Sequence, residues 1–321
     1  MTLRLSVVGC QRELTTDNRQ LNTEHRSSHR MAAIGYYLAL PFLYGISLLP
    51  FPLLYVASEI LNFCVFTVIG YRRDVILTNL RNSFPEKSEK EIRVIAREFR
   101  RWFCDLVVET LKTLTASPEA IRKRVSIEGF DVLREYARKG QSVILVLGHH
   151  GNWELAGARY SLEKDIPQLY VIYHPLENER FDALVKHMRT RHGTKLYTMQ
   201  ETSRAMLRDR HLLTATAFIA DQTPAPERAH WMEFMHQDTP VFLGTETLAR
   251  KLGHPVIYIS VDRKKRGYYN MKAELLVADP VLTSQGEITE RHTRRLEEDI
   301  RKKPETWLWT HRRWKHRRPN E

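Results

Sequence analysis

The chain has 321 residues, with 50 lysines and arginines against 38 aspartates and glutamates, and a formal net charge of +12. Its mean hydropathy of −0.43 excludes a polytopic membrane transporter, and its 42% hydrophobic content excludes a wholly disordered chain. The three cysteines, Cys10, Cys64 and Cys104, are far apart in the sequence, which excludes a zinc ribbon and a disulfide framework.

The first seventy residues divide into a polar leader and an apolar foot. Residues 1–30 are polar and contain no apolar stretch of the signal-peptide type, so we expect a disordered leader or a misassigned start site. Residues 31–70 carry one charge, on Glu59, and three prolines interrupt them. We therefore predict two helical segments, 32–49 and 53–70, that anchor the chain in a membrane. A hairpin, a shallow insertion and a single span followed by an interfacial helix all fit, and the alternative is a pair of buried core helices.

A long helix is predicted next to this foot. Ser88 and Glu91 form a capping-box pattern, and apolar residues at helical spacing continue to about Leu114. The opposite face of this helix carries four arginines, at positions 93, 97, 100 and 101. A solvated helix face is the ordinary interpretation of such a charge run, and contact with anionic lipid headgroups is the second.

From about residue 125 onward, strand and helix patterns alternate. Apolar runs predict buried strands at 142–147, 169–173, 212–219, 256–261 and 268–276. Helical patterns lie near 153–163, 178–191, 202–210 and 286–302. The alternation predicts an α/β domain over residues 71–321, with a mostly parallel central sheet flanked by helices and a basic C-terminal tail.

The strongest chemical signal follows the strand predicted at 142–147. The segment Gly148–Glu154 reads GHHGNWE, and active sites in open α/β sheets lie at the carboxyl ends of strands. His149 can pair with Glu154 if the histidine ends the strand and the glutamate lies in the first turn of the next helix. Such a carboxylate fixes the tautomer of the imidazole and leaves the other ring nitrogen to act as a base.

Other interpretations of this loop stay open. The two histidines can be structural groups that are bonded within the fold. His150 and Glu154, four residues apart, can share a metal ion, but no third ligand is nearby in the sequence, so neither a metal nor another cofactor is expected. A nucleophilic triad is disfavoured because the chain has no G-x-S-x-G pattern and no cysteine close to a histidine.

Five blocks of sequence, this loop among them, resemble one family. GHHGNWE is similar to the H-x-x-x-x-D/E motif of lysophospholipid acyltransferases, and it is closest to the lipid A biosynthesis acyltransferase branch. The other similar blocks are Val171–Asn178 with Arg189 and Gly193, Ala220–Gln222, Phe242–Gly244 with Pro255–Val256, and Pro304–Lys315. The resemblance covers about residues 31–315 and implies a glycerol-phosphate-acyltransferase-like fold.

The resemblance also implies a reaction and its residues. The family transfers an acyl chain from a thioester, usually on acyl carrier protein, to a hydroxyl of a lipid. By resemblance, His149 is the general base and Glu154 orients it. The implied substrate-binding residues are Asn152, His174, Asn178, Arg189, Asp221 and Gln222.

Some of these residues can instead have a purely structural role. Arg189 can instead be a solvated helix charge, and Asp221 with Gln222 can brace a loop. His174 stands where many members of the family have arginine, and a histidine is a poorer fixed cation near neutral pH. Recognition of the headgroup or of the acyl donor is therefore expected to differ at this position.

The expected function is transfer of a fatty acyl chain from acyl carrier protein, or from acyl-CoA, to a hydroxyl of a lipid A precursor. The expected location is the inner membrane, with the catalytic domain on its cytoplasmic face. Another glycolipid or a lysophospholipid stays open as acceptor, and so does a lipid-binding protein or hydrolase on the same scaffold. The tail, basic and rich in tryptophan, suits an anionic membrane surface, and the alternative for Trp307 and Trp309 is that they pack on the domain. No nucleic-acid partner is expected, because the chain has no motif for binding one.

Overall fold

A seven-stranded sheet organises the computed structural model, which describes residues 33–319. The strand order is β1-β9-β8-β2-β5-β3-β4; β8 and β9 are antiparallel, and every other neighbouring pair in this sheet is parallel. The strands are β1 (Val125–Glu128), β2 (Val143–Leu147), β3 (Gln168–Tyr173), β4 (Lys195–Thr198), β5 (Thr214–Ile219), β8 (Val256–Lys265) and β9 (Tyr268–Val277). The predicted α/β fold with a mostly parallel sheet is confirmed.

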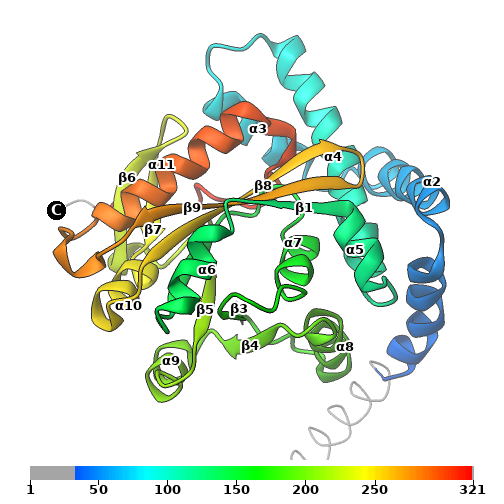
Figure 1. Cartoon of the computed structure of the whole chain (residues 1–321). Helices are drawn as coiled ribbons and strands as arrows, with labels where there is room; N and C mark the ends of the chain where they lie inside the picture. The colour runs from blue at the N-terminus through cyan, green and yellow to red at the C-terminus, as the bar shows by residue number, and fades with distance from the viewer. Residues whose placement is uncertain (1–32, 320–321) are drawn as a thin grey trace, which may run out of the picture.

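Helices cover both faces of this sheet (Figure 1). The helices are α3 (Arg73–Ser83), α4 (Glu89–Lys112), α5 (Pro118–Arg124), α6 (Asp131–Arg138), α7 (Trp153–Tyr160), α8 (Glu179–Thr190), α9 (Thr202–Arg208), α10 (Gly244–Leu252) and α11 (Glu287–Lys302). Ile144 and Val146 of β2 pack with α3, α4 and α11, whereas Val143 and Leu145 pack with α6 and α7. Successive residues of β2 therefore enter opposite cores, which explains its unbroken apolar sequence.

Two elements lie outside this layered body. A separate two-stranded antiparallel ladder consists of β6 (Ala229–Phe234) and β7 (Gln237–Phe242). The predicted apolar foot forms a helix over Ala33–Leu48, followed by α2 (Phe51–Asn62) and the π-helix η1 (Phe63–Val68). The break at Pro50 between the two helices is where the sequence predicts it. The expectation for residues 1–30 lies outside the described residues.

The foot is attached to the domain along one face. Among residues 33–319, the segment Phe51–Val68 alone is long and apolar enough to cross a membrane. Yet Ser58 of α2 donates a hydrogen bond to Asp105 of α4 at 2.7 Å, and Tyr55 donates one to Glu109 at 2.9 Å. The predicted membrane anchor is therefore supported by composition only, because one face of this helix is bonded to the domain.

The predicted helix next to the foot is confirmed as α4. Its capping box is complete: the Ser88 hydroxyl accepts from the backbone of Glu91, whose carboxylate accepts from the backbone N–H of Ser88. Arg93, Arg97 and Arg101 are exposed, as expected for a solvated face.

Several side chains of the C-terminal segment are buried in the domain, although its composition is that of a solvated tail. Trp307 and Trp309 are 2% and 0% exposed, and Arg313 is 1% exposed. The backbone carbonyl of Trp309 accepts a hydrogen bond from Asn79 of α3 at 2.9 Å. These tryptophans therefore belong to the core, which favours the alternative that they pack on the domain over contact with a membrane surface.

Candidate active site

The side chain of His149 meets a carboxylate at the carboxyl edge of the sheet. Its Nδ1 lies 2.6 Å from Oδ1 of Asp221, and its backbone N–H donates to Oδ2 of the same residue at 2.7 Å. His149 follows β2 and Asp221 follows β5, and these two strands are neighbours. The parallel pairing of β2 with β5 thus brings together two residues that are far apart in the sequence.

Trp307 also forms a hydrogen bond with the Asp221 carboxylate. Its indole N–H donates to Oδ2 at 2.7 Å, so this oxygen accepts two N–H groups and Oδ1 faces the imidazole. Burial opposes the ionisation of Asp221, but the imidazole and these donors outweigh it and lower the pKa of the carboxyl to about 2. Because an ionised carboxylate only accepts hydrogen bonds, Nδ1 of His149 must carry the proton and Nε2 is left as the basic atom.

The loop after β2 is held in place by its own backbone. Gly151 has a positive φ of +65°, and its N–H donates to the carbonyl of Thr306 at 2.9 Å. A Cβ atom at this position would lie 2.0 Å from the carbonyl oxygen of Val261, a contact that no side chain can make. Glycine is therefore required here, and the loop is clamped between β8 and the C-terminal segment.

The expected pairing of His149 with Glu154 is not what the structure shows. The Glu154 carboxylate instead forms a bidentate ion pair with Arg189 of α8, with Nη2–Oε1 and Nε–Oε2 distances of 2.5 and 3.1 Å. The spacing in the sequence makes Glu154 the nearest carboxylate along the chain, but the order of the strands places Asp221 against the imidazole. Both His149 and Glu154 line the same pocket, so they remain neighbours in the site.

Asn152 is a structural residue by its contacts. It is fully buried, its Oδ1 accepts from the backbone of Leu155 at 2.9 Å, and its Nδ2 donates to Glu109 at 2.7 Å. The first contact caps the N-terminus of α7. The expectation that Asn152 touches substrate does not match this geometry, since both ends of its amide are used within the protein.

The other expected substrate residues differ in position. Gln222 and His174 are exposed and line the pocket, and Nε2 of Gln222 lies 3.5 Å from Nε2 of His149. Asn178 caps α8 by accepting from the backbone of Arg180 and Phe181, and it is not among the residues that line the pocket.

The alternative of a metal shared by His150 and Glu154 finds no matching geometry. His150 is buried, and its Nε2 contacts the Thr306 hydroxyl at 2.9 Å, while Glu154 is bound to Arg189. Within residues 33–319 there is no group of three or more histidine, cysteine, aspartate or glutamate side chains that fits a metal ion.

A large pocket opens beside Nε2 of His149. Its volume is about 610 Å³, within the range of pockets that hold organic ligands. The α7 wall contributes Trp153, Ala156 and Gly157, and the sheet contributes Leu145 of β2 and Leu169 of β3. Since α7 starts at the carboxyl edge of the sheet and runs back along it, these residues form an apolar space that leads away from His149.

Three features of this region were not foreseen from the sequence. The partner role of Asp221, the indole contact of Trp307 and the buried guanidinium of Arg313 all depend on segments that meet only in the folded chain. Their signal in the sequence is the place of Asp221 after a buried strand and the unusual density of tryptophan in Pro304–Lys315.

Comparison with known proteins gives the family. The family described as bacterial lipid A biosynthesis acyltransferase matches residues 23–316. The lipid A biosynthesis palmitoleoyltransferase of Escherichia coli (strain K12) is 24% identical over 273 residues, which cover 84% of this chain and 87% of that protein.

The lipid A biosynthesis myristoyltransferase of the same organism is 23% identical over 158 residues, or 49% of this chain and 48% of that protein. Lipid A biosynthesis acyltransferase 2 of Shigella flexneri is 22% identical over 156 residues, or 49% of each chain. These two alignments thus span about half the length of the relatives, while the family match spans nearly the whole chain. The chain therefore belongs to the bacterial lipid A biosynthesis acyltransferase family.

Proposed function

We propose that this protein transfers a fatty acyl group from a thioester, on acyl carrier protein or coenzyme A, to a hydroxyl of a lipid A precursor. The observation that carries the proposal is the His149–Asp221 pair at the mouth of an apolar pocket of about 610 Å³. An imidazole held by a carboxylate supplies the base, and the apolar space suits a fatty chain. The names of the relatives indicate the lipid A precursor as acceptor.

In the proposed mechanism, Nε2 of His149 accepts the proton of the acceptor hydroxyl while its oxygen attacks the thioester carbonyl. A C–O bond forms, and the tetrahedral intermediate then breaks its C–S bond. The imidazolium returns the proton to the departing thiolate, so the base is regenerated. Asp221 stabilises the imidazolium and keeps the proton on Nδ1 in the resting state.

Gln222 and the Glu154–Arg189 pair border the reacting atoms. Nε2 of Gln222 lies 3.5 Å from Nε2 of His149, so this amide marks the space that the acceptor hydroxyl enters. Arg189 lines the pocket with its charge offset by Glu154. We propose that the pair holds α8 against α7 and presents a guanidinium N–H to a polar group of either substrate.

The foot is proposed to dock the enzyme on the cytoplasmic face of the inner membrane. Leu53, Val56 and Ile60 of α2 are exposed, at 53–60% of their surface, and lie on the side opposite Tyr55 and Ser58. A helix with one face bonded to a soluble domain and an exposed apolar face suits insertion parallel to one leaflet. This placement brings a lipid acceptor to the domain without requiring a complete span.

The test is an assay of the purified full chain with acyl carrier protein and acyl-CoA thioesters as donors. A Kdo-containing lipid A precursor and a lysophospholipid are offered as competing acceptors, and products are identified by mass spectrometry. The proposal predicts an acylated lipid A precursor. Acylation of the lysophospholipid alone, or release of free fatty acid without acceptor acylation, would contradict it.

A further inference from the structure

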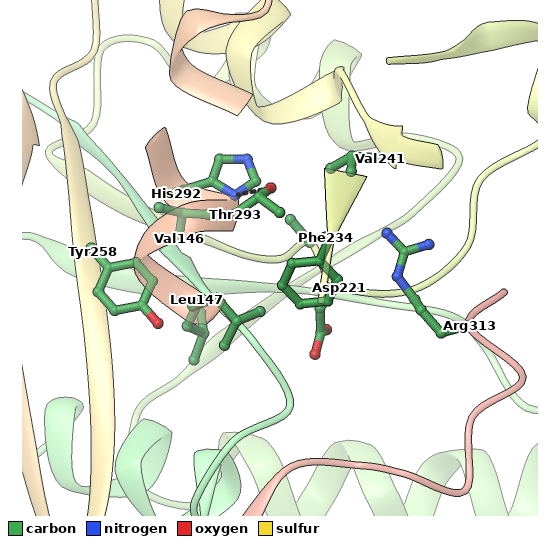
Figure 2. A pocket seen from close by; sticks show the side chains of 11 residues that line it. Val146, Leu147, Asp221, Phe234, Val241, Tyr258, His292, Thr293 and Arg313 are labelled. Atoms are coloured by element: carbon green, nitrogen blue, oxygen red, sulfur yellow. Dashed lines mark hydrogen bonds between the residues drawn. The ribbon is translucent and has the colours of Figure 1, made fainter. Parts of the chain in front are cut away.

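Behind the His149–Asp221 pair lies a second, much smaller cavity of about 10 Å³, room for roughly one water molecule. Figure 2 shows Asp221, His292 and Arg313 around it, each from a different part of the chain: the end of β5, α11 and the C-terminal segment. The rest of the lining is mostly apolar, with Val146, Phe234 and Leu296 among its residues. This cavity lies beside the large pocket: Leu147 and Ala220 line both, and Asp221 contacts His149.

Arg313 is an unusual residue to find in such a place. It is 1% exposed, and its Nε and Nη1 atoms have no hydrogen-bond partner among the described residues. No carboxylate within residues 33–319 lies at ion-pair distance from it. Burying a guanidinium without a direct partner costs free energy. We therefore expect an opposite charge nearby that offsets this cost.

Asp221 supplies the one carboxylate that lines the cavity together with Arg313. These are the two charged residues among the described residues that line the cavity. Burial lowers the pKa of Arg313 to about 10, with attraction to Asp221 opposing the change, so the guanidinium remains charged at neutral pH. Asp221 is ionised as well, and the pair forms a through-space counter-charge rather than a hydrogen-bonded salt bridge.

The other titratable groups near Asp221 are neutral around pH 7. Burial lowers the pKa of His292 to about 4 and also lowers that of His311 below its ordinary value, while the pKa of Tyr258 is raised by burial. The Glu154–Arg189 ion pair lines the same pocket as His149, and its two charges offset each other. Among the residues described, His149 is thus the remaining titratable group in contact with Asp221. Its charge state depends on whether Asp221 already has a counter-charge.

We propose that Arg313 is a positioning residue for the general base: its buried cation balances the charge of Asp221, so that His149 can remain a neutral imidazole. With Arg313 present, protonation of His149 gives the cluster of three residues a net positive charge in a buried setting. Without Arg313, the same protonation neutralises a buried carboxylate and becomes favourable. The arginine therefore keeps the base free to accept the hydroxyl proton.

This inference rests on the proposed role of His149 as base, but its test does not require acyl transfer. Diethyl pyrocarbonate modifies neutral imidazole, and His149 is accessible because 15% of its side chain is exposed at the pocket. The rate of modification of the His149 peptide, followed by mass spectrometry from pH 5 to 8, reports the protonation of this residue in the full-length protein. The variants are Arg313→Gln, Arg313→Lys and the matched control Arg312→Gln, whose side chain is exposed one residue away.

The proposal predicts that the pH midpoint of His149 modification rises by about one unit in Arg313→Gln. It predicts a midpoint close to that of the parent in Arg313→Lys, which keeps the charge, and in Arg312→Gln. The acidic limb of kcat/KM should move in the same way where activity is measured. Loss of packing alone lowers stability and leaves the midpoint unchanged, so the two roles are separable.

An unchanged midpoint in Arg313→Gln would overturn the proposal, and so would an equal shift in Arg313→Lys. If the glutamine variant does not fold, the parent protein still tests the idea. A modification midpoint above about pH 7 in the parent would show that Arg313 does not keep the imidazole neutral. A parent without acyltransferase activity but with the predicted midpoints would contradict the proposed function and leave this inference standing.

Discussion

Nδ1 of His149 lies 2.6 Å from Oδ1 of Asp221, although 72 positions separate the two residues in the sequence. The contact exists because β2 and β5 are adjacent and parallel, so that the residues that follow them meet at one edge of the sheet. It fixes both the orientation of the imidazole and the nitrogen that carries the proton. The proposed chemistry depends on this relationship.

Asp221→Asn should therefore lower kcat by about 10²–10⁴-fold with little change in folding. Oδ2 of Asp221 accepts two N–H groups, from the backbone of His149 and the indole of Trp307. The asparagine oxygen will occupy that place, and its NH₂ group will then face Nδ1. The imidazole must accept there, so its proton moves to Nε2 and the base is lost.

The matched variant is Glu154→Gln, measured in the same steady-state assay. Because Glu154 pairs with Arg189 rather than with His149, we expect a change mainly in KM and a smaller loss of kcat than in Asp221→Asn. A larger loss of kcat in Glu154→Gln than in Asp221→Asn would show that Glu154, rather than Asp221, orients the imidazole of His149.

The second prediction concerns Glu109, which holds the N-terminal cap of α7. Its buried carboxylate accepts from Asn152, Tyr269 and Tyr55 at 2.7–2.9 Å. Glu109→Ala leaves two buried donors and one half-buried donor without an acceptor, and it should lower the free energy of unfolding by about 3 kcal/mol. Urea unfolding followed by circular dichroism measures this change.

Glu109→Gln is the control for that experiment. Burial raises the pKa of Glu109, so an uncharged amide suits the site, and its oxygen can still accept from Asn152 and Tyr269. A loss below about 1 kcal/mol is expected. Equal destabilisation by alanine and glutamine would show that the charge of Glu109, rather than its hydrogen bonds, matters for stability.

The third prediction concerns the acyl chain length. Gly157 lines the large pocket, one helical turn beyond Glu154 on α7, and a Cβ atom there would meet only Leu169 Cδ2, at 4.0 Å. A larger side chain at this position should fill the pocket without a clash. In the series Gly157→Ala, Gly157→Val and Gly157→Leu, we expect progressively shorter acyl chains in the product.

Mass spectrometry of products from a mixture of acyl donors measures the chain-length profile. Gly45→Leu is the control, because Gly45 is also a helical glycine where an added Cβ atom would meet nothing within 4 Å, but it lies in the foot. An unchanged profile across the Gly157 series, in active protein, would place the acyl chain elsewhere in the pocket.

The fourth prediction is a pH dependence of stability. Burial lowers the pKa of His292 to about 4 from an ordinary value near 6.5, so the unfolded chain binds this proton first. The stabilising contribution is complete above pH 6.5 and is lost as the pH falls towards 4, at about 1.4 kcal/mol per pH unit for one proton. His292→Gln should flatten the fall of the unfolding free energy between pH 6.5 and 4.5.

His174→Gln provides the comparison, since it removes an exposed histidine instead of a buried one. Denaturant unfolding at pH 7.5, 6.0 and 4.5 gives the slope for each protein. The same slope in His292→Gln as in the parent would mean that His292 is not held neutral by its surroundings.

Much of the layered fold was predictable because local patterns specify it. The apolar runs of β2, β3, β5, β8 and β9 are long enough to identify, and the Ser88–Glu91 pattern gives the start of α4. β1 and β4 were missed because each has only four residues with little apolar character. The helices α5 and α6 were also missed, because segments of seven and eight residues are too short to show a clear helical period.

The site was only half predictable, for a different reason. A local motif places His149 at the end of a strand, but it cannot state which strand lies beside it. Glu154 is close to His149 in the sequence, whereas Asp221 is close to it in the sheet, and the hydrogen bond follows the sheet. Trp307 and Arg313 enter from the C-terminal segment, where basic composition favours a solvated tail and the density of tryptophan is the signal for burial.

His149→Ala removes the proposed base for acyl transfer. The measurement is the initial rate of acylation of the lipid A precursor at saturating donor and acceptor, with thermal unfolding as a check of folding. If His149 is the base, the rate should be about 10²–10⁴-fold below that of the parent, in a protein that unfolds at a similar temperature. A folded His149→Ala protein that acylates the precursor at the parental rate would contradict it.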